Sequence, residues 1–227
     1  MSGVWAVLVA AGRGERLGGD RPKAFAPLRG RPLLAESLER LEASPRVDAI
    51  VVVAPPDWEE PSILVAEEIG AGKVAACVPG GATRSGSVRI GVSEVPEDAE
   101  VILVHDAARP LLPERVVERV LDALERGADG AVPGLPVADT LKRRSGADVT
   151  GTVDRSELVA VQTPQGFRAA KLRQALAGAV EEATDCAAFV EAAGGRVEVV
   201  EGDPALLKVT TADDLARAAW LLESGRT

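Results

Sequence analysis

The chain has 227 residues, of which 46% are hydrophobic and 27% are charged, a composition typical of a soluble globular protein. Only 3% of the residues are aromatic and tyrosine is absent, which argues against a stacking surface for single-stranded nucleic acid. The 26 basic and 35 acidic residues give a net charge of −9, whereas proteins that bind duplexes are usually basic. Nucleic acid is therefore a disfavoured partner, and any anionic substrate must be bound by local basic groups.

Cysteine and histidine are too few for several kinds of site. Cys77 and Cys186 cannot form a disulfide framework or a zinc site, and we interpret each as a small core residue. His105 is the single histidine, which excludes sites with several histidine ligands, and we expect it to be structural. No apolar run approaches the roughly 18 residues of a membrane span, and the first residues lack a signal-peptide pattern. We expect a cytoplasmic chain with no membrane partner.

Strands and helices are expected to alternate along residues 4–137. Apolar runs bounded by glycine or proline predict buried strands at 4–9, 49–54, 74–78, 101–104 and 131–137. Helical spacing or helix-start signals occur at 34–41, 58–69, 85–95 and 113–127. The alternation predicts one doubly wound, mostly parallel sheet with helices on both faces, which is a Rossmann-like α/β fold.

Residues 138–163 interrupt this alternation. A polar stretch, a turn-like tip and an extended stretch over 149–161 predict one long β-hairpin, with Arg155 on its returning strand. A projecting hairpin is marginally stable alone, so we expect it to pack against a second copy of the chain. Two helical stretches, a strand over 196–201 and a last helix follow. We expect a single domain over 1–227, with 138–163 as an arm for dimerisation and substrate binding.

The loop after the first strand is rich in glycine and basic residues. It starts like a dinucleotide-binding fingerprint, but Leu17 stands where glycine or alanine is required, and no acidic residue ends the second strand. A Walker motif is absent as well. Backbone N–H groups together with Arg16 and Lys23 suit a triphosphate, and the alternative is an ordinary surface loop. Ligands of such sheets bind beyond the carboxyl ends of the strands, where three unusual clusters fall, at 10–25, 80–87 and 105–110.

The sequence of this loop and several later motifs resemble those of one enzyme family. Ala10-Ala-Gly-Arg-Gly-Glu-Arg-Leu17 followed by Pro22-Lys23 resembles the signature of nucleotidyltransferases of the sugar-nucleotide pyrophosphorylase type. The later motifs fall in the order seen in the 2-C-methyl-D-erythritol 4-phosphate cytidylyltransferase family of the non-mevalonate isoprenoid pathway. These motifs are Gly80-Gly-Ala-Thr-Arg-Ser-Gly-Ser-Val88, His105-Asp-Ala-Ala-Arg-Pro110, Asp139-Thr-Leu-Lys142, Thr152-Val-Asp-Arg155, Gln162-Thr-Pro-Gln165, Thr184-Asp185 and Lys208-Val-Thr-Thr211.

The resemblance implies a homodimeric enzyme that transfers CMP from CTP to methylerythritol phosphate, with Mg²⁺ as the cofactor. It implies nucleotide binding by Ala10, Ala11, Gly12, Gly14, Gly81, Ser87, Asp106 and Ala107, and metal binding by Asp106. It implies catalytic roles for Arg16, Lys23, Arg155 and Lys208. It implies that Arg109, Thr140, Arg155 and Thr184 hold the methylerythritol phosphate, with Arg155 supplied by a partner subunit. The family pattern is not kept everywhere, because Ala82 stands where a carboxylate is common, Ala24 where glutamine is usual and Cys186 where an acidic or small polar residue is common.

Such a reaction is consistent with a site that lacks an activated nucleophile. A phosphate monoester is largely dianionic near neutral pH, because its second pKa is about 6, so it needs no general base. Positioning and charge compensation by Lys, Arg and Mg²⁺ are what a phosphoryl-type transfer requires.

Three alternative functions remain open from the residues. A ribitol 5-phosphate cytidylyltransferase would share the CTP loop and differ at Arg109, Thr140 and Arg155. A catalytically silent nucleotide-binding regulator would be expected to lack Arg16 or Lys23, and both are present. The hypothesis of an NAD-dependent dehydrogenase has less support, because Leu17 departs from the dinucleotide-binding fingerprint and the second strand ends without an acidic residue. Taken alone, Lys208 and Arg155 are more typical of ordinary solvated charges than of functional groups.

Overall fold

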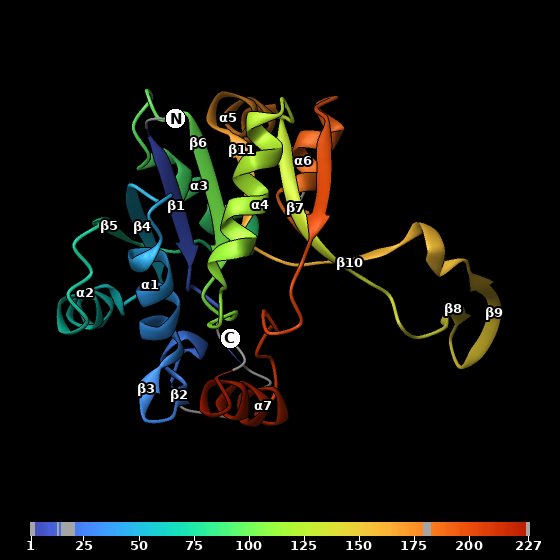
Figure 1. The fold of residues 1–227 in the computed structure, drawn as a ribbon, viewed down its shortest axis with the longest axis horizontal. Helices are drawn as coiled ribbons and strands as arrows, with labels where there is room; N and C mark the ends of the chain where they lie inside the picture. Colours follow the sequence, from blue (N-terminus) through green and yellow to red (C-terminus); the bar gives the residue numbers. More distant parts are fainter. Residues whose placement is uncertain (1–2, 13, 15–20, 179–182, 226–227) are drawn as a thin grey trace.

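The structure is a computed structural model that describes residues 3–12, 14, 21–178 and 183–225 (Figure 1). Its centre is an eight-stranded sheet in the order β10-β7-β11-β6-β1-β4-β5, with β12 paired to β7 beside this path. The strands that pair in parallel form two groups. The first consists of β1 (Val4–Val9), β4 (Ala49–Ala54), β5 (Val74–Pro79) and β6 (Val101–Asp106). The second consists of β7 (Gly130–Pro136) and β12 (Val197–Glu201). The mostly parallel sheet expected from the sequence is confirmed.

Helices cover both faces of this sheet, as expected. One face carries α1 (Leu33–Ala43), α2 (Glu59–Glu68) and α4 (Glu114–Glu125). The other carries α3 (Arg84–Ser93), α5 (Ala169–Gly178) and α6 (Ala187–Ala192). The last helix, α7 (Ala212–Glu223), packs near the small hairpin of β2 (Pro27–Leu28) and β3 (Arg31–Pro32). None of the described helices has the length and apolar character needed to cross a membrane.

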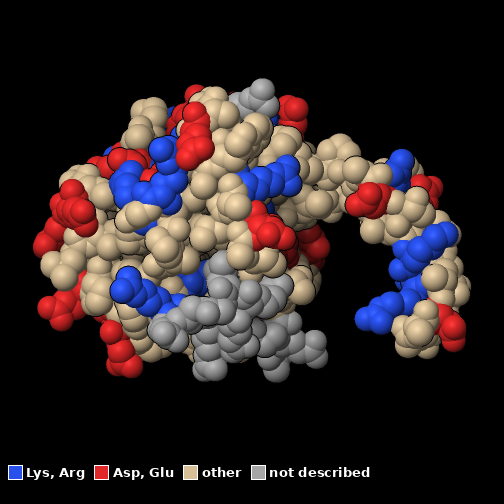
Figure 2. All heavy atoms as spheres, turned by 90° about the horizontal axis from the view of Figure 1, so that it is seen from below, with Lys and Arg blue, Asp and Glu red and all other residues tan. Residues whose placement is uncertain are grey.

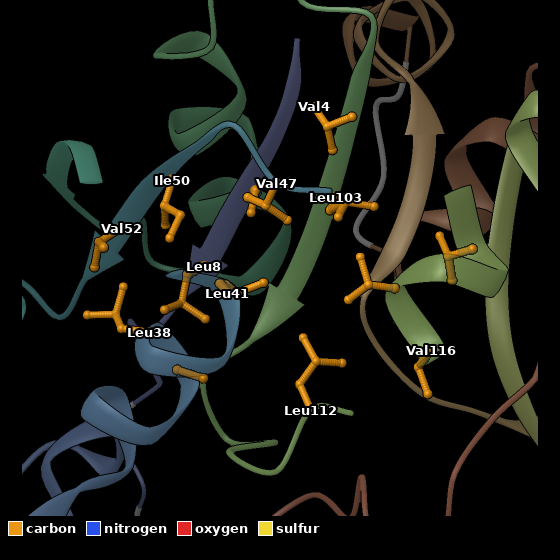
Figure 3. Close-up of a cluster of buried hydrophobic side chains, with 14 of the residues drawn as sticks. Val4, Leu8, Leu38, Leu41, Val47, Ile50, Val52, Leu103, Leu112 and Val116 are labelled. Atoms are coloured by element: carbon orange, nitrogen blue, oxygen red, sulfur yellow. The ribbon is translucent and has the colours of Figure 1, made fainter. Parts of the chain in front are cut away.

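The central strands are apolar on both sides because each face of the sheet is covered. Successive residues of a strand point to opposite faces. In β1, Val4 and Leu8 join the core beneath α1 and α4, whereas Val7 joins the core beneath α3 and α5. Figure 3 shows the first of these cores, where Leu38 and Leu41 of α1 lie over the sheet. This double burial explains why the strands are continuous apolar runs in the sequence.

The sequence did not predict the strand β11 (Gln165–Arg168). It lies antiparallel between β6 and β7 and closes the gap between the two parallel groups. Gly166 faces α4, and an added Cβ there would overlap Val120 and lie 3.0 Å from Leu103 Cδ2. Because this close packing needs glycine, the strand carries no apolar alternation that a sequence pattern could reveal.

The arm differs from the single long hairpin that the sequence predicted. Its hairpin consists of β8 (Leu141–Ser145) and β9 (Asp148–Val153), and it projects from the body of the molecule (Figure 1). The Asp154 side chain accepts a hydrogen bond from Ser156 N at 3.0 Å and starts the 3₁₀ turn η3 (Arg155–Glu157), which ends the extended stretch. The chain then returns as β10 (Val159–Val161), which pairs with β7 in the central sheet. Arg155 therefore lies in a turn and not on a returning strand.

The last helix, α7, begins with a capping box, in which Thr211 Oγ1 accepts from Asp214 N and the Asp214 carboxylate accepts from Thr211 N. His105 and Cys186 are buried, as expected, whereas Cys77 is only half-buried on β5. The assignment of one domain with a dimerising arm stays a prediction.

Candidate active site

A cleft of about 1020 Å³ opens at the carboxyl ends of β1, β4, β5 and β6. Its walls come from the loops that follow these strands, at residues 10–12 and 14, 55–56, 80–84 and 107–108. Lys23 from η2 (Lys23–Phe25) and Lys208 from the segment before α7 also line it. The three sequence clusters thus meet at one edge of the sheet, where such folds bind their ligands.

Glycines allow the two loops of the cleft to approach each other closely. An added Cβ on Gly80 would overlap Ala11 Cβ, so the loop after β5 can lie against the loop after β1 only with glycine there. Gly81 N donates to Ser87 Oγ at 3.1 Å, and Thr83 caps α3 by accepting from Gly86 N at 3.0 Å. The amino end of α3 therefore faces the cleft, which favours an anionic ligand.

The first loop also lies against Lys23. Gly14 has a φ of +74°, and an added Cβ would be 2.7 Å from Lys23 Cβ. Lys23 N donates to Gly12 O at 3.3 Å. This contact holds the lysine at the mouth of the glycine loop. Arg16, which the sequence predicted to act with Lys23, lies outside the described residues.

Asp106 is the centre of the charged part of the cleft. One carboxylate oxygen, Oδ1, accepts from Arg84 Nε at 3.2 Å and Nη2 at 3.1 Å, and the other, Oδ2, accepts from Lys208 Nζ at 2.7 Å. Burial alone would raise the pKa of this carboxyl, but the charges of Arg84 and Lys208 outweigh burial and hold the pKa well below its usual range. Asp106 is therefore an ionised carboxylate held between two cations.

His105 does not reach the cleft as a base. It is fully buried, its Nε2 lies 3.1 Å from Arg109 O and its Nδ1 lies 3.1 Å from Thr163 Oγ1. Because a carbonyl only accepts, Nε2 carries the proton, and Nδ1 accepts from the Thr163 hydroxyl. Burial lowers the pKa of His105 to about 4, so the ring is neutral near pH 7. This confirms the expectation that the histidine is structural.

The structure brings all eight predicted nucleotide residues together, and with them two of the residues predicted to be catalytic. The nucleotide residues that line the cleft are Ala10, Ala11, Gly12, Gly14, Gly81, Ser87, Asp106 and Ala107, and the catalytic ones are Lys23 and Lys208. Their individual roles stay predictions.

The residues predicted to hold the second substrate are more dispersed. Arg109 is not among the residues that line the cleft. Its Nη1 donates to Leu206 O at 2.8 Å, and its Nε is the one buried side-chain nitrogen without a hydrogen-bond partner among the described residues. Thr184 is exposed in the loop before α6. Thr140 and Arg155 are exposed on the arm, where Arg155 donates to Ala138 O. The arm projects from the body of the molecule (Figure 1), and none of its residues lines the cleft.

The described residues of the cleft offer few ligands for a divalent cation. The described residues contain no group of three or more carboxylate, cysteine or histidine side chains that could hold a metal ion. Both oxygens of Asp106 already bind cationic side chains. Mg²⁺ commonly binds through substrate phosphates with one or two carboxylates. The residues therefore fit an ion that arrives with a nucleotide and not a permanent metal site.

Sequence reasoning assigned no role to Arg84. The residue stands inside the motif at 80–88, but a charged residue that begins a helix is typical of an exposed surface. Only the fold shows that it meets Asp106, which lies 22 residues further on. The one available signal was the poor match between a cation and a helix amino end.

The sheet, the glycine loop and the basic cleft define a nucleotidyltransferase-like α/β protein. A solved structure titled 4-diphosphocytidyl-2C-methyl-D-erythritol synthase superposes with a TM-score of 0.83 and 33% identity, covering 98% of this chain and 99% of that one. The 2-C-methyl-D-erythritol 4-phosphate cytidylyltransferase from Thermus thermophilus superposes with a TM-score of 0.79 and 37% identity, covering 96% of this chain and 98% of that one.

Sequence comparisons identify the family within this class of protein. A 2-C-methyl-D-erythritol 4-phosphate cytidylyltransferase of Saccharopolyspora erythraea is 50% identical over 223 residues, which span 96% of this chain and 99% of the relative. The family model described as 2-C-methyl-D-erythritol 4-phosphate cytidylyltransferase matches residues 4–224. The chain belongs to this family, as its motifs indicated.

Proposed function

We propose that this chain transfers CMP from CTP to 2-C-methyl-D-erythritol 4-phosphate, giving 4-diphosphocytidyl-2-C-methyl-D-erythritol and pyrophosphate. In this reaction an oxygen of the substrate phosphate attacks the α-phosphorus of CTP, and the bond from that phosphorus to the pyrophosphate oxygen breaks. The observation that carries the proposal is the single cleft that joins a glycine loop, Lys23 and the Asp106–Lys208 pair. The relatives above carry names for the same activity.

The nucleotide side of the cleft suits a triphosphate. Backbone groups of residues 10–12 and 14 would surround the phosphates, since glycine and alanine leave the N–H groups accessible. Lys23, together with Arg16, would compensate the charge that develops at the α-phosphate. Mg²⁺ bound to the phosphates would supply further charge neutralisation, with Asp106 as the carboxylate nearest to it.

The second substrate would bind at the opposite wall. Lys208 would orient the attacking phosphate, and its ammonium is already held at this wall by Asp106. Arg109 is anchored two residues before this lysine in the chain, because its Nη1 donates to Leu206 O at 2.8 Å, and its buried Nε has no hydrogen-bond partner among the described residues. Both groups are cations, and a dianionic nucleophile needs such partners to approach a triphosphate.

A homodimer would complete the site. Thr140 and Arg155 lie on an arm that contributes no residue to the lining of its own cleft, so we infer that they act in the cleft of another subunit. Val149, Val159 and Val161 are exposed on the arm and its base, and a partner would bury them. Figure 2 shows Lys and Arg side chains gathered along the arm, which suits delivery to a phosphate site. The cytoplasmic location expected from the sequence stays a prediction.

The test is release of pyrophosphate by the purified protein with CTP and methylerythritol phosphate. Ribitol 5-phosphate replaces the acceptor in one arm of the assay, and UTP or ATP replaces the nucleotide in the others. We expect rapid release only with CTP and methylerythritol phosphate. Equal kcat/KM with ribitol 5-phosphate would favour the alternative acceptor, and equal kcat/KM with UTP would reject selectivity for cytosine. No release with any pair would leave the silent regulator as the better interpretation.

A further inference from the structure

Arg84 occupies a position that helix stability does not explain. It is the first residue of α3, directly after the cap Thr83. The positive end of the helix dipole lies there, so a cation at this position is unfavourable for the helix. Nevertheless its side chain is only 24% exposed and is turned toward Asp106. Arg84 therefore serves a contact beyond its own helix.

The contact is a fork on one oxygen of the carboxylate. Two guanidinium nitrogens, Nε and Nη2, lie within 3.2 Å of Asp106 Oδ1, and the third, Nη1, lies 3.7 Å from the sulfur of Cys186. Cys186 is fully buried, so it supports the back of the guanidinium. Lysine offers one compact ammonium on a flexible stem and cannot copy this arrangement.

The remaining oxygen of Asp106 binds the lysine that faces the substrate. Lys208 Nζ lies 2.7 Å from Oδ2, and its side chain is 40% exposed to the cleft. Asp106 carries one negative charge, and Arg84 and Lys208 carry one positive charge each. With Arg84 present, the group keeps a net charge of about +1 beside the substrate. Without Arg84, Asp106 and Lys208 would form a neutral pair.

We propose that Arg84 is a positioning residue that neutralises Asp106 and so leaves the charge of Lys208 available to the phosphate of the acceptor substrate. The inference rests on the proposed function, because that function supplies the anion which Lys208 meets. It assigns Arg84 an action through Asp106 and Lys208, without a bond of its own to the acceptor.

Removal of the Arg84 charge should raise the KM for one substrate much more than the KM for the other. Arg84→Gln removes the charge and keeps much of the side-chain length. It should raise the KM for methylerythritol phosphate by about 10- to 100-fold, the range expected when a hydrogen bond to a charged group is lost. The KM for CTP should change much less. Arg84→Lys keeps the charge but not the fork, so it should recover part of the loss.

The decisive experiment is a double-mutant cycle with Asp106→Asn. If Arg84 acts by neutralising Asp106, Arg84→Gln should have little further effect on the KM for methylerythritol phosphate once Asp106 is a neutral amide. Equal fold-losses in the wild-type and Asp106→Asn backgrounds would show that Arg84 acts independently, and the proposal would be wrong. The cycle is repeated with Arg84→Lys, so that it can be interpreted even where Arg84→Gln unfolds.

A matched control lies on the same helix. Arg89 is a cation of α3 that contacts Leu176 O and the ring of Phe189 on the side away from the cleft. Arg89→Gln should leave both KM values near those of the wild type, and a loss like that of Arg84→Gln would indicate a general effect of charge on α3 and overturn the proposal. Turnover by the wild type tests the proposed function separately. If the wild type is inactive, the same cycle is measured by calorimetric binding of inorganic phosphate, where additive losses again overturn the role of Arg84.

Discussion

Gly14 and Lys23 are so close that no side chain fits between them. An added Cβ on Gly14 would lie 2.7 Å from Lys23 Cβ, closer than real Cβ contacts, and 3.0 Å from Lys23 Cα. Gly14 also has a φ of +74°, which other residues adopt at a cost. The glycine therefore sets the position of the lysine that the proposed mechanism places beside the α-phosphate.

Gly14→Ala should accordingly lower activity by displacing Lys23. We expect kcat/KM for CTP to fall by roughly 10- to 100-fold, because small displacements of catalytic groups have effects of this size. Gly30→Ala is the matched control, since Gly30 has a φ of +83° and nothing within 4 Å of the added Cβ. Gly30→Ala should lose about 1–2 kcal/mol of stability in urea unfolding because of its positive φ, and Gly14→Ala should lose more because its Cβ also overlaps Lys23. Gly30→Ala should keep its kcat/KM. Equal activity losses in the two variants would remove the argument for a steric role of Gly14.

Lys23→Ala should affect the chemical step more than binding. If Lys23 stabilises charge that develops only in the transition state, kcat should fall by about 10²- to 10³-fold while the KM for CTP changes little. Steady-state kinetics with each substrate varied in turn provide the measurement. Lys171→Ala removes a lysine that pairs with Asp129, outside the cleft lining, and should leave kcat near that of the wild type. A normal kcat in folded Lys23→Ala would show that the lysine has no role in the transition state.

The sequence predicted the parallel strands well because their signal is local. The runs over 49–54 and 101–104 are apolar throughout, since both faces of each strand are buried. β11 gave no such signal, because its Gly166 packs against α4 and its Gln165 hydrogen bonds to Asp185. β10 was assigned to the arm because its pairing with β7 depends on tertiary structure alone.

Some residues of the candidate site could likewise be predicted from the sequence, whereas others could not. The glycine loop and the strand-end residues could be predicted, because backbone geometry and sheet topology place them at one edge. Arg84 could not, since its partners Asp106 and Cys186 are 22 and 102 residues away in the sequence. The break at Asp154 depends on one side-chain hydrogen bond to Ser156, which the extended pattern over 149–161 conceals.

Stability should depend on pH through His105. The folded state lowers the pKa of His105 to about 4, below its ordinary value of 6.5, because burial disfavours the charged ring. The unfolded chain therefore binds the proton more tightly, and the free energy of unfolding should fall as pH falls from about 6.5 toward 4. Between pH 7.5 and pH 5 the loss should be about 2 kcal/mol.

Urea unfolding at fixed protein concentration would measure this loss. His105 is the only histidine of the chain, so it is the main group expected to titrate between pH 5 and 7. His105→Gln should lower stability near pH 7.5, where the wild-type ring is neutral in both states, and should remove most of the slope over this range. A slope that persists unchanged in the variant would assign the pH dependence to other groups.

Arg155 provides the test of a site shared between subunits. The residue lies in the turn η3 of the arm, and it is not among the residues that line the cleft of its own chain. In the proposed dimer its guanidinium would bind the acceptor phosphate with two parallel hydrogen bonds. Arg155→Ala should therefore raise the KM for methylerythritol phosphate and leave the KM for CTP nearly unchanged. Arg143→Ala, on the same arm in β8, is the control for loss of a positive charge.

Mixing two impaired variants would show directly whether the subunits share their sites. Arg155→Ala and Lys23→Ala are assayed at low methylerythritol phosphate, where each is nearly inactive alone. After random exchange about half of the dimers are mixed, and in each mixed dimer one of the two sites takes Lys23 and Arg155 from the two unmutated copies, as two-fold symmetry requires. Activity should then recover to about a quarter of the wild-type value, because half of the sites in half of the dimers are intact. If subunit exchange is demonstrated with labelled chains and no activity returns, each site must be built from a single chain, and the arm must have another role.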